Sequence, residues 1–377
     1  MTRIEGHDAL HARLGRTPGA SPEDARRTNR SLVLRALHLG GPQSRADLAK
    51  LIRVTPATVS SVVRELVDDG IVEELGRTTA RHVGKPATML GIRPDGRHIL
   101  AVDLSSHEQF VGALVDLDGK VVHRRSLARH DARGTAATAL LVRLVAELVD
   151  AAERPLLGAG VASPGYVHPD GIISNATHLG WDHVDLVAAL RDVVDVDVHV
   201  VNDANASALA ELTYGEHDSD HIVVVRVDEG VGAGIVLDGQ LHSGSSGGGG
   251  EIGHVVTDPS GPRCVCGKRG CLETFVSAPL LAATAGSAST TLLGQTGHAL
   301  GAGIAMLVSA VDADDVVLSG SVEVLSETFL SAVHDAISER TLPHLADRLT
   351  VRGTSFLDAD VLLGAAALVL DRALGIR

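Results

Sequence analysis

The 377-residue sequence predicts an α/β body of two lobes that follows a small winged helix-turn-helix domain. Three helical patterns precede two strand patterns within the first hundred residues, and strands and helices alternate from His98 onwards. Residues 1–100 carry 16 Lys and Arg against 11 Asp and Glu, whereas residues 101–377 carry 17 against 36. We therefore expect a front part that can approach phosphate and a body that repels it.

The composition argues against several classes of protein. Aromatic residues make up only 2% of the chain, which disfavours RNA binding by base stacking. The chain has no run of about 18 apolar residues, so we expect no membrane span. Charged residues occur throughout the first 25 positions, where a signal peptide would be apolar, and we therefore expect a cytoplasmic protein.

Spacing and capping residues predict the first helices. Residues 1–25 are polar, have no period and are expected to form a flexible arm. From Asn29 apolar residues recur at helical spacing until Gly40 ends the first helix. Ser44 has the N-cap position of a second helix over residues 45–52.

A third helix and a two-stranded wing complete the front domain, which spans residues 26–95. The helix is predicted from Thr55, its N-cap, to Asp69, and the strands at 71–75 and 87–92. This is the layout of a winged helix-turn-helix, whose third helix enters the major groove of DNA. The expected DNA contacts are small or basic residues of this helix and the wing: Thr55, Ala57, Thr58, Ser60, Ser61, Arg64, Arg77, Arg81 and Lys85. A plain three-helix bundle with a solvated basic loop is the alternative.

The body, residues 96–377, has the alternation expected of two lobes of mixed sheet. Segments 98–123 and 222–242 share a strand-turn-strand opening, although no tandem repeat is visible. Further strands are predicted at 157–162, 198–201 and 316–318, and helices at 135–152, 204–214, 300–311 and 361–374.

The only three cysteines, Cys264, Cys266 and Cys271, lie within eight residues. In a cytosolic chain such a cluster indicates a metal site before a disulfide. A closed tetrahedral zinc site needs a fourth ligand. His254 is the nearest candidate, but spacing alone does not select it among 19 histidines. Three unrelated buried cysteines are the alternative.

These residues carry a family resemblance. The segment from Glu251 to Glu273, with its Glu-Ile-Gly-His sequence and three cysteines, resembles the signature of the ROK family of repressors, open reading frames and sugar kinases. Residues 201–206 and 163–181 are similar to the sugar-binding segments of that family. The front domain resembles the winged helix of the family's repressor branch, so the resemblance extends over most of the chain.

The resemblance implies an α/β two-lobed actin-like (ribonuclease H-like) fold, which ATPases and sugar kinases share, behind the winged-helix domain. It implies a structural zinc ion held by His254, Cys264, Cys266 and Cys271. It also implies a site in which carboxylates and amides bind sugar hydroxyl groups. The residues implied for that site are Asn202, Asp203, Glu251, His254, Glu273 and His178. For Asn202 and Asp203, a merely capped strand-to-helix turn is the alternative.

The chain departs from the pattern of the family at one place and from that of its kinases at two more. His178 stands where the family often has Asn. Residues 103–107 read Asp-Leu-Ser-Ser-His where kinases have roughly Asp-x-Gly-Gly-Thr, and residues 228–232 begin with Asp-Glu where kinases have Gly-Thr. Phosphate-binding turns need backbone N–H groups close to the phosphates, which Cβ atoms and carboxylates oppose.

The sequence therefore predicts a sugar-responsive transcriptional regulator, a repressor without catalytic residues. Its expected partners are operator DNA, a sugar or sugar-phosphate effector, and further copies of itself in a homodimer or tetramer. The main rival is a DNA-tethered sugar kinase that uses ATP, with Asp203 as general base. A zinc protein with an inactive sugar site is a third possibility, for which His178 is the only hint.

Overall fold

Three helices and a small antiparallel sheet, of strand order β1-β3-β2, form the front domain. Its elements are α2 (Pro22–Gly40), β1 (Gln43–Ser44), α3 (Arg45–Leu51), α4 (Pro56–Asp68), β2 (Val72–Arg77) and β3 (Thr88–Ile92). Both predicted N-caps are confirmed: the Ser44 side chain accepts a hydrogen bond from Asp47 N, and that of Thr55 from Thr58 N. The predicted winged helix is therefore present.

The computed structural model describes residues 22–77, 87–217, 219–277, 279–281, 290–321 and 323–376. Arg81, Lys85 and residues 1–21 of the predicted arm lie outside the described residues. Residues 22–25 of that arm belong to α2, which starts seven residues before Asn29. Periodicity missed this start because the first turns are polar; the usable signals were a proline at the first position and the acidic residues that follow it.

Two five-stranded sheets with the same strand topology form the body. The first has the order β11-β7-β4-β5-β6 and the second the order β14-β13-β12-β15-β16. The strands of the first sheet are β4 (His98–Asp103), β5 (Gln109–Val115), β6 (Val121–Ala128), β7 (Leu156–Ser163) and β11 (Val198–Asn202). Those of the second are β12 (Ile222–Val227), β13 (Val231–Leu237), β14 (Gln240–Leu241), β15 (Asp315–Gly320) and β16 (Thr350–Gly353). The shared antiparallel opening predicted from the sequence is confirmed in both.

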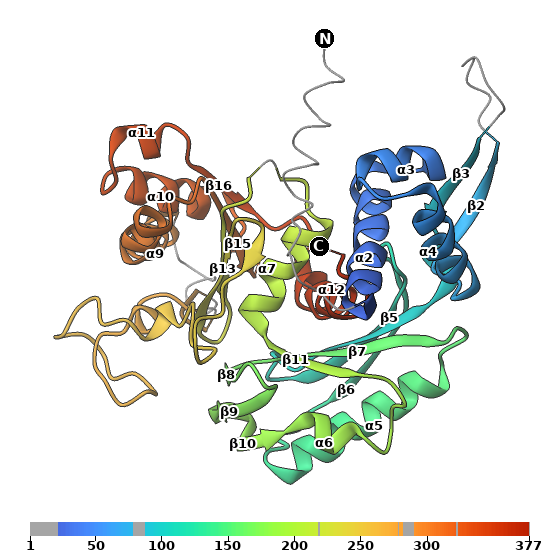
Figure 1. The fold of residues 1–377 in the computed structure, drawn as a ribbon. Coiled ribbons are helices and arrows are strands. Elements are labelled where there is room, and N and C mark those ends of the chain that lie inside the picture. The colour runs from blue at the N-terminus through green and yellow to red at the C-terminus, as the bar shows by residue number, and fades with distance from the viewer. Residues whose placement is uncertain are drawn as a thin grey trace.

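Helices cover both sheets, and two of them lie between the sheets (Figure 1). The inner pair is α7 (Asp203–Tyr214) and α12 (Asp360–Leu374). The outer helices are α5 (Thr135–Asp150) and α6 (Leu186–Leu190) on the first sheet, and α9 (Thr290–Val311), α10 (Glu327–Ser338) and α11 (Pro343–Ala346) in the second lobe. A Cβ at Gly364 of α12 would overlap Ala206 O of α7, so glycine allows these helices to approach closely.

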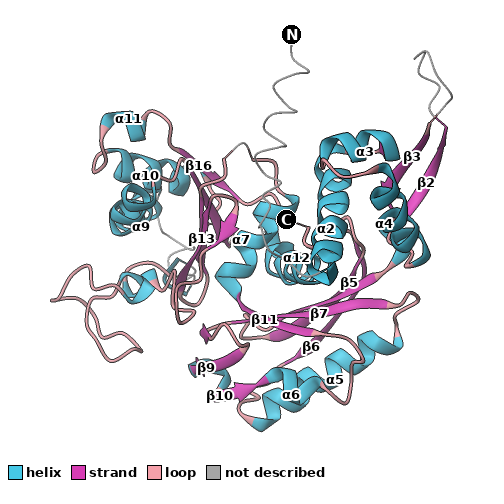
Figure 2. Cartoon of the chain, viewed as in Figure 1, coloured by secondary structure: helices cyan, strands magenta, loops and turns pink. Residues whose placement is uncertain are grey.

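Short elements escaped the sequence analysis. A second small sheet consists of β8 (Tyr166–Val167), β9 (Ile172–Ala176) and β10 (Trp181–Asp185), all visible as short magenta arrows beside the first sheet (Figure 2). Single 3-10 turns lie at η1 (Pro94–Gly96), η2 (Thr177–Leu179), η3 (Ile252–His254), η4 (Leu272–Thr274) and η5 (Leu357–Ala359). Segments this short carry too few residues to show a period.

The hydrophobic core of the front domain continues into the first lobe. One cluster of buried side chains includes Leu34 of α2, Val63 of α4, Ile99 of β4 and Leu370 of α12. Figure 1 shows α2 beside α12, next to the C-terminus. Within the described ranges, we find no helix with the length and apolar character that a membrane span requires.

Candidate functional site

The three cysteines and His254 converge on one point of the second lobe, and we call these four residues the metal cluster. One ligand atom from each lies within 4.8 Å of those of all the others. Cys264 Sγ lies 3.5 Å from His254 Nδ1, and Cys266 Sγ lies 3.6 Å from Cys271 Sγ. A tetrahedron with Zn–S bonds of about 2.3 Å has S–S edges of about 3.8 Å, so the cluster can hold a metal ion such as zinc.

Local backbone geometry brings the cysteines together. Gly267 and Gly270 have positive φ angles of 91° and 68°, and a Cβ at Gly270 would overlap Asp258 O. The turn between Cys264 and Cys271 is closed by the hydrogen bond from Cys264 N to Lys268 O, 2.9 Å long. The two glycines are therefore needed for the chain to fold back on itself, as the sequence predicts.

Two predicted sugar-binding carboxylates accompany the metal cluster. Glu273 Oε1 accepts a hydrogen bond from Cys264 Sγ at 2.8 Å and lies 3.4 Å from His254 Nδ1. Glu251 is exposed and stands at the start of the turn that ends with His254. His254 thus turns Nδ1 towards Cys264 and Glu273, which leaves Nε2 for another partner.

Asn202 and Asp203 lie where β11 meets α7, in the first lobe. Asn202 is the N-cap of α7: its Oδ1 accepts from Asn205 N, and its Nδ2 donates to Gly165 O and Asp203 Oδ1, both at 3.0 Å. The capping alternative therefore describes Asn202, whose amide is largely used within the protein. Asp203 is the first helical residue, and its second oxygen, Oδ2, faces Arg226.

Arg226 is a site residue that the sequence analysis missed. It lies in β12, and its guanidinium contacts Asp228 at 2.7 Å, Asp360 at 3.5 Å and Asp203 at 3.7 Å. With Asp103, which also interacts with this guanidinium, these residues form what we call the carboxylate cluster: Asp103, Asp203, Asp228 and Asp360. The signal was available, because Arg226 is the only charged residue in the apolar run 222–227.

Burial controls protonation in the carboxylate cluster. It raises the pKa of Asp203 to about 7, although the neighbouring Arg226 acts in the opposite direction. Burial likewise raises the pKa of Asp103, whose Oδ1 accepts hydrogen bonds from both the backbone N–H and the hydroxyl of Ser105. A carboxyl group with a pKa near 7 can bind a hydroxyl group in either protonation state.

The three segments that depart from the pattern of the family lie close together. The rings of His107 and His178 are 4.5 Å apart between centroids, and His107 Nδ1 lies 3.8 Å from Glu229 Oε2. Burial lowers the pKa of His178 to about 4, with a contribution from the charge of His107, so His178 is neutral at pH 7. His107 belongs to segment 103–107, His178 to segment 163–181 and Glu229 to segment 228–232.

The predicted sugar-binding residues thus fall into three groups: Glu251, His254 and Glu273; Asn202 and Asp203; and His178. In the described part of the chain, no hydrogen bond or ion pair joins one group to another. Residues 230–232, around the start of β13, lie near both of the first two groups. A Cβ on Gly230 would lie 3.2 Å from Glu273 Oε2, and one on Gly232 would lie 3.1 Å from Ala204 Cβ.

The predicted DNA-reading helix, α4, has one buried face and one face that is open to solvent. Val59, Val62, Val63 and Leu66 of α4 are buried against the domain core. The predicted contact residues on the other side are not buried; Thr55, Ala57, Ser61 and Arg64 are exposed, and Thr58 and Ser60 are partly exposed. Two of the acidic residues near this helix are paired, Asp69 with Arg30 at 2.6 Å and Glu74 with Arg45 at 2.9 Å.

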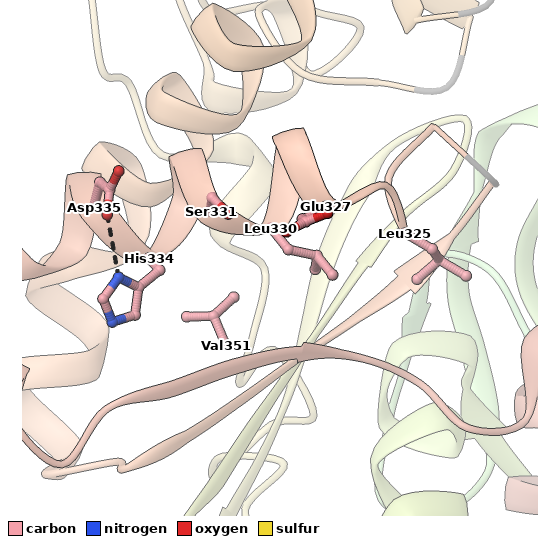
Figure 3. A pocket seen from close by; sticks show the side chains of 7 residues that line it. All are labelled: Leu325, Glu327, Leu330, Ser331, His334, Asp335 and Val351. Atoms are coloured by element: carbon pink, nitrogen blue, oxygen red, sulfur yellow. Dashed lines mark hydrogen bonds and ion pairs between the residues drawn. The ribbon is translucent and has the colours of Figure 1, made fainter. Parts of the chain in front are cut away.

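A hollow on the second lobe lies between α10 and β16 (Figure 3). Its lining consists of Leu325, Glu327, Leu330, Ser331, His334, Asp335 and Val351. None of the residues predicted to bind sugar, metal or DNA is among them, so this hollow is separate from the clusters described above.

Comparison with known proteins agrees with this division of the chain. The ROK family model matches residues 99–372, and the MarR family model matches residues 29–77. The DNA-binding transcriptional dual regulator NagC of Escherichia coli K12 is 28% identical over 375 residues, which cover 90% of this chain and 92% of NagC. The xylose repressor of Bacillus subtilis 168 is 25% identical, covering 92% of this chain and 96% of that protein.

Solved structures give the same result. A ROK family transcriptional regulator described as a homologue of the E. coli MLC protein superposes with a TM-score of 0.80 at 26% identity, covering 93% of this chain and 98% of that one. A Streptomyces griseus ROK glucokinase in complex with glucose and AMPPNP has a TM-score of 0.62 and covers 72% of this chain and 98% of the glucokinase; at 23% identity it supports the fold alone. The two-lobed sugar-kinase-like fold behind a winged helix is therefore confirmed, and this chain belongs to the ROK family.

Proposed function

We propose that this protein is a sugar-responsive transcriptional repressor. One observation carries the proposal: a ROK body and a MarR-type winged helix occur in one chain, in an arrangement that covers nine tenths of this chain and of NagC alike. We assign DNA binding to residues 26–95 and sugar binding to residues 96–377. The exposed face of α4 supports the first assignment, and the carboxylates beside β13 support the second.

The DNA partner is an operator with two half-sites. A winged helix on a symmetric oligomer reads an inverted repeat, so we propose a homodimer or tetramer. The predicted contact residues of α4 read base edges. The wing contacts the sugar-phosphate backbone of the DNA through Arg77, Arg81 and Lys85.

Zinc in the metal cluster shapes the sugar site. A closed Cys3His site leaves no position for water, so the metal is structural. Its role is to fix His254 and Glu273 in the orientation that the sugar site needs. In this proposal Asp203, Glu251, His254 and Glu273 bind sugar hydroxyl groups, Asn202 orients Asp203, and His178 contacts the sugar from the other side.

The phosphoryl-donor site is lost in this proposal. The hydroxyl of Ser105 accepts a hydrogen bond from Arg226 at 3.2 Å, and Asp228 pairs with the same arginine. The resemblance to the kinases of the family implies that these carboxylates and the arginine take the place of the groups that hold the phosphates of ATP. The kinase alternative has one observation in its favour, the Asp203 pKa of about 7, which suits a general base.

A DNA-binding titration with an enzymatic control separates the two functions. The full chain should bind its own upstream DNA more tightly than random DNA, and glucose, N-acetylglucosamine or xylose should change that affinity. Coupled assays with ATP and the same sugars should give no rate above the blank. A sugar-dependent rate that disappears in Asp203→Asn would establish the kinase instead, and equal affinity for all DNA would exclude the repressor.

A further inference from the structure

Arg226 connects the two lobes of the body through a buried guanidinium. Its side chain is only 12% exposed, and it reaches residues of both lobes. Besides the carboxylates at 2.7, 3.5 and 3.7 Å, it donates to two hydroxyl groups at 3.2 Å. These partners are Ser105 and Asp203 of the first lobe, Asp228 and Ser319 of the second, and Asp360 at the start of α12.

The donors of Arg226 are not all used. Nη1 donates to Ser319 and faces Asp360, and Nη2 donates to Asp228 and Ser105. Nε is buried and has no hydrogen-bond partner among the described residues. Asp203 Oδ2 lies 3.7 Å from Nε, which is too long for a hydrogen bond, and it accepts no hydrogen bond from the described residues.

The unpaired donor Arg226 Nε and the unpaired acceptor Asp203 Oδ2 can together bind one hydroxyl group. A hydroxyl oxygen about 2.8 Å from each atom would accept from Nε–H and donate to Oδ2, since a hydroxyl group does both at once. Leaving a buried N–H without a partner costs roughly 1–3 kcal/mol, so a ligand that satisfies it gains affinity. A fully deprotonated phosphate oxygen cannot do the same, because it has no proton to donate.

The charge of the carboxylate cluster also favours binding of an alcohol over binding of its phosphate ester. One guanidinium faces the four carboxyl groups of the carboxylate cluster, and Glu229 stands one residue beyond Asp228. Even with Asp103 and Asp203 protonated, Asp228 and Asp360 outnumber Arg226. A phosphate dianion at this point would therefore meet net negative charge in a buried environment, where like charges repel strongly.

We propose that Arg226 is a specificity-determining residue of the effector site: with Asp203 it binds one neutral hydroxyl group of the sugar, and the carboxylate cluster excludes the phosphate ester of that hydroxyl. This inference rests on the proposed sugar response and narrows its effector to unphosphorylated sugars. An arginine can equally mark a phosphate site, and that possibility is the outcome that would overturn the assignment.

Matched pairs of ligands test the proposal on the intact full-length protein. Glucose, mannose and N-acetylglucosamine are compared with their 6-phosphates by thermal shift and by calorimetric titration. We expect at least one free sugar to bind at least tenfold more tightly than its phosphate. The 1-phosphates are measured in the same way, because the bound hydroxyl group can be at either end of the sugar. If every phosphate ester binds as tightly as its free sugar, the inference is overturned but the sugar response is kept. If neither free sugars nor phosphate esters bind, both the inference and the sugar response are refuted.

Variants test the role of Arg226 itself. Arg226→Lys keeps the charge but lacks the Nε–H, and should weaken free-sugar binding at least tenfold. Asp228→Asn should shift the ratio of the two affinities at least threefold towards the phosphate. Arg352→Met is the matched control, because it removes another partly buried arginine, paired with Glu211 and Asp315, and should leave the ratio unchanged. Wild-type free-sugar affinity in a folded Arg226→Lys protein would overturn the assignment.

Discussion

Arg35 Nε donates a hydrogen bond of 2.9 Å to the carbonyl oxygen of Gly375, and so joins the first helix of the front domain to the end of α12. At its other end, α12 begins with Asp360, which accepts hydrogen bonds from Ser207 and Ser319 and faces Arg226. Fifteen helical residues span about 22 Å. A single helix therefore runs from the carboxylate cluster to the DNA-binding domain.

Replacing Arg35 should uncouple sugar binding from DNA binding. In Arg35→Ala we expect the effect of the sugar on DNA affinity to fall at least threefold, because a site can influence another only through an element that both contact. Sugar affinity measured without DNA should change less than twofold. Arg348→Ala, which removes an exposed arginine of the second lobe paired with Asp312, is the control. An unchanged sugar effect in Arg35→Ala would show that the coupling takes another route.

The purified chain should contain about one zinc ion per subunit, as expected of a closed four-ligand site. Cys266→Ser should lose the metal and lower the melting temperature, because metal binding free energy contributes to folding. Ser260→Ala, a change in the same loop, should retain the metal. Elemental analysis of protein prepared without chelators measures the zinc content of the wild type and of both variants, and a thermal melt measures the stability of Cys266→Ser. The absence of zinc from the wild type would refute the assignment.

Arg64→Ala should weaken binding to the specific operator by about 1–3 kcal/mol if the side chain reads a base. Random DNA should lose much less, because base contacts contribute little to non-specific binding. Arg143→Ala, on the exposed side of α5 in the body, controls for the loss of one positive charge. Equal losses on both DNAs would make Arg64 a backbone contact.

The wing residues should behave differently. Arg77→Ala, Arg81→Ala and Lys85→Ala should each weaken binding to all DNA sequences and lower the salt slope of binding by about one unit. Fluorescence anisotropy titrations at several salt concentrations measure this slope. A slope that stays at the wild-type value in all three variants would remove the wing from the interface.

Sugar affinity should rise between pH 6 and pH 8. With a pKa of about 7, Asp203 goes from about one tenth to about nine tenths ionised, and the carboxylate accepts the stronger hydrogen bond. The gain is at most about tenfold, and Asp203→Asn should show none. Stability should move in the opposite direction: the folded chain holds a proton that the unfolded chain releases, so this group favours folding most below about pH 4 and less as the pH rises to about 7.

Much of the fold followed from local signals. Ser44 and Thr55 predicted the starts of two helices, because an N-cap side chain accepts a hydrogen bond from a backbone N–H only three residues further on. The cysteine spacing and its glycines indicated a metal site for the same reason, since that loop closes on itself. The start of α2 and the strands β8 to β10 were missed, because polar first turns and very short strands carry no hydrophobic period.

The sequence by itself determined the family, the winged helix in front of an α/β body, and the three-cysteine loop, because each depends on residues close together in the chain. The family resemblance implied His254 as the fourth ligand, and the structure brings it to the cysteines. Only the tertiary structure placed Arg226 among Asp103, Asp203, Asp228 and Asp360, and His107 against His178. The carboxylates around Arg226 span 257 positions of the chain, from Asp103 to Asp360, and come from both lobes and from the start of α12. Such a juxtaposition depends on how the lobes pack, and packing is a property of the whole buried core rather than of any one segment.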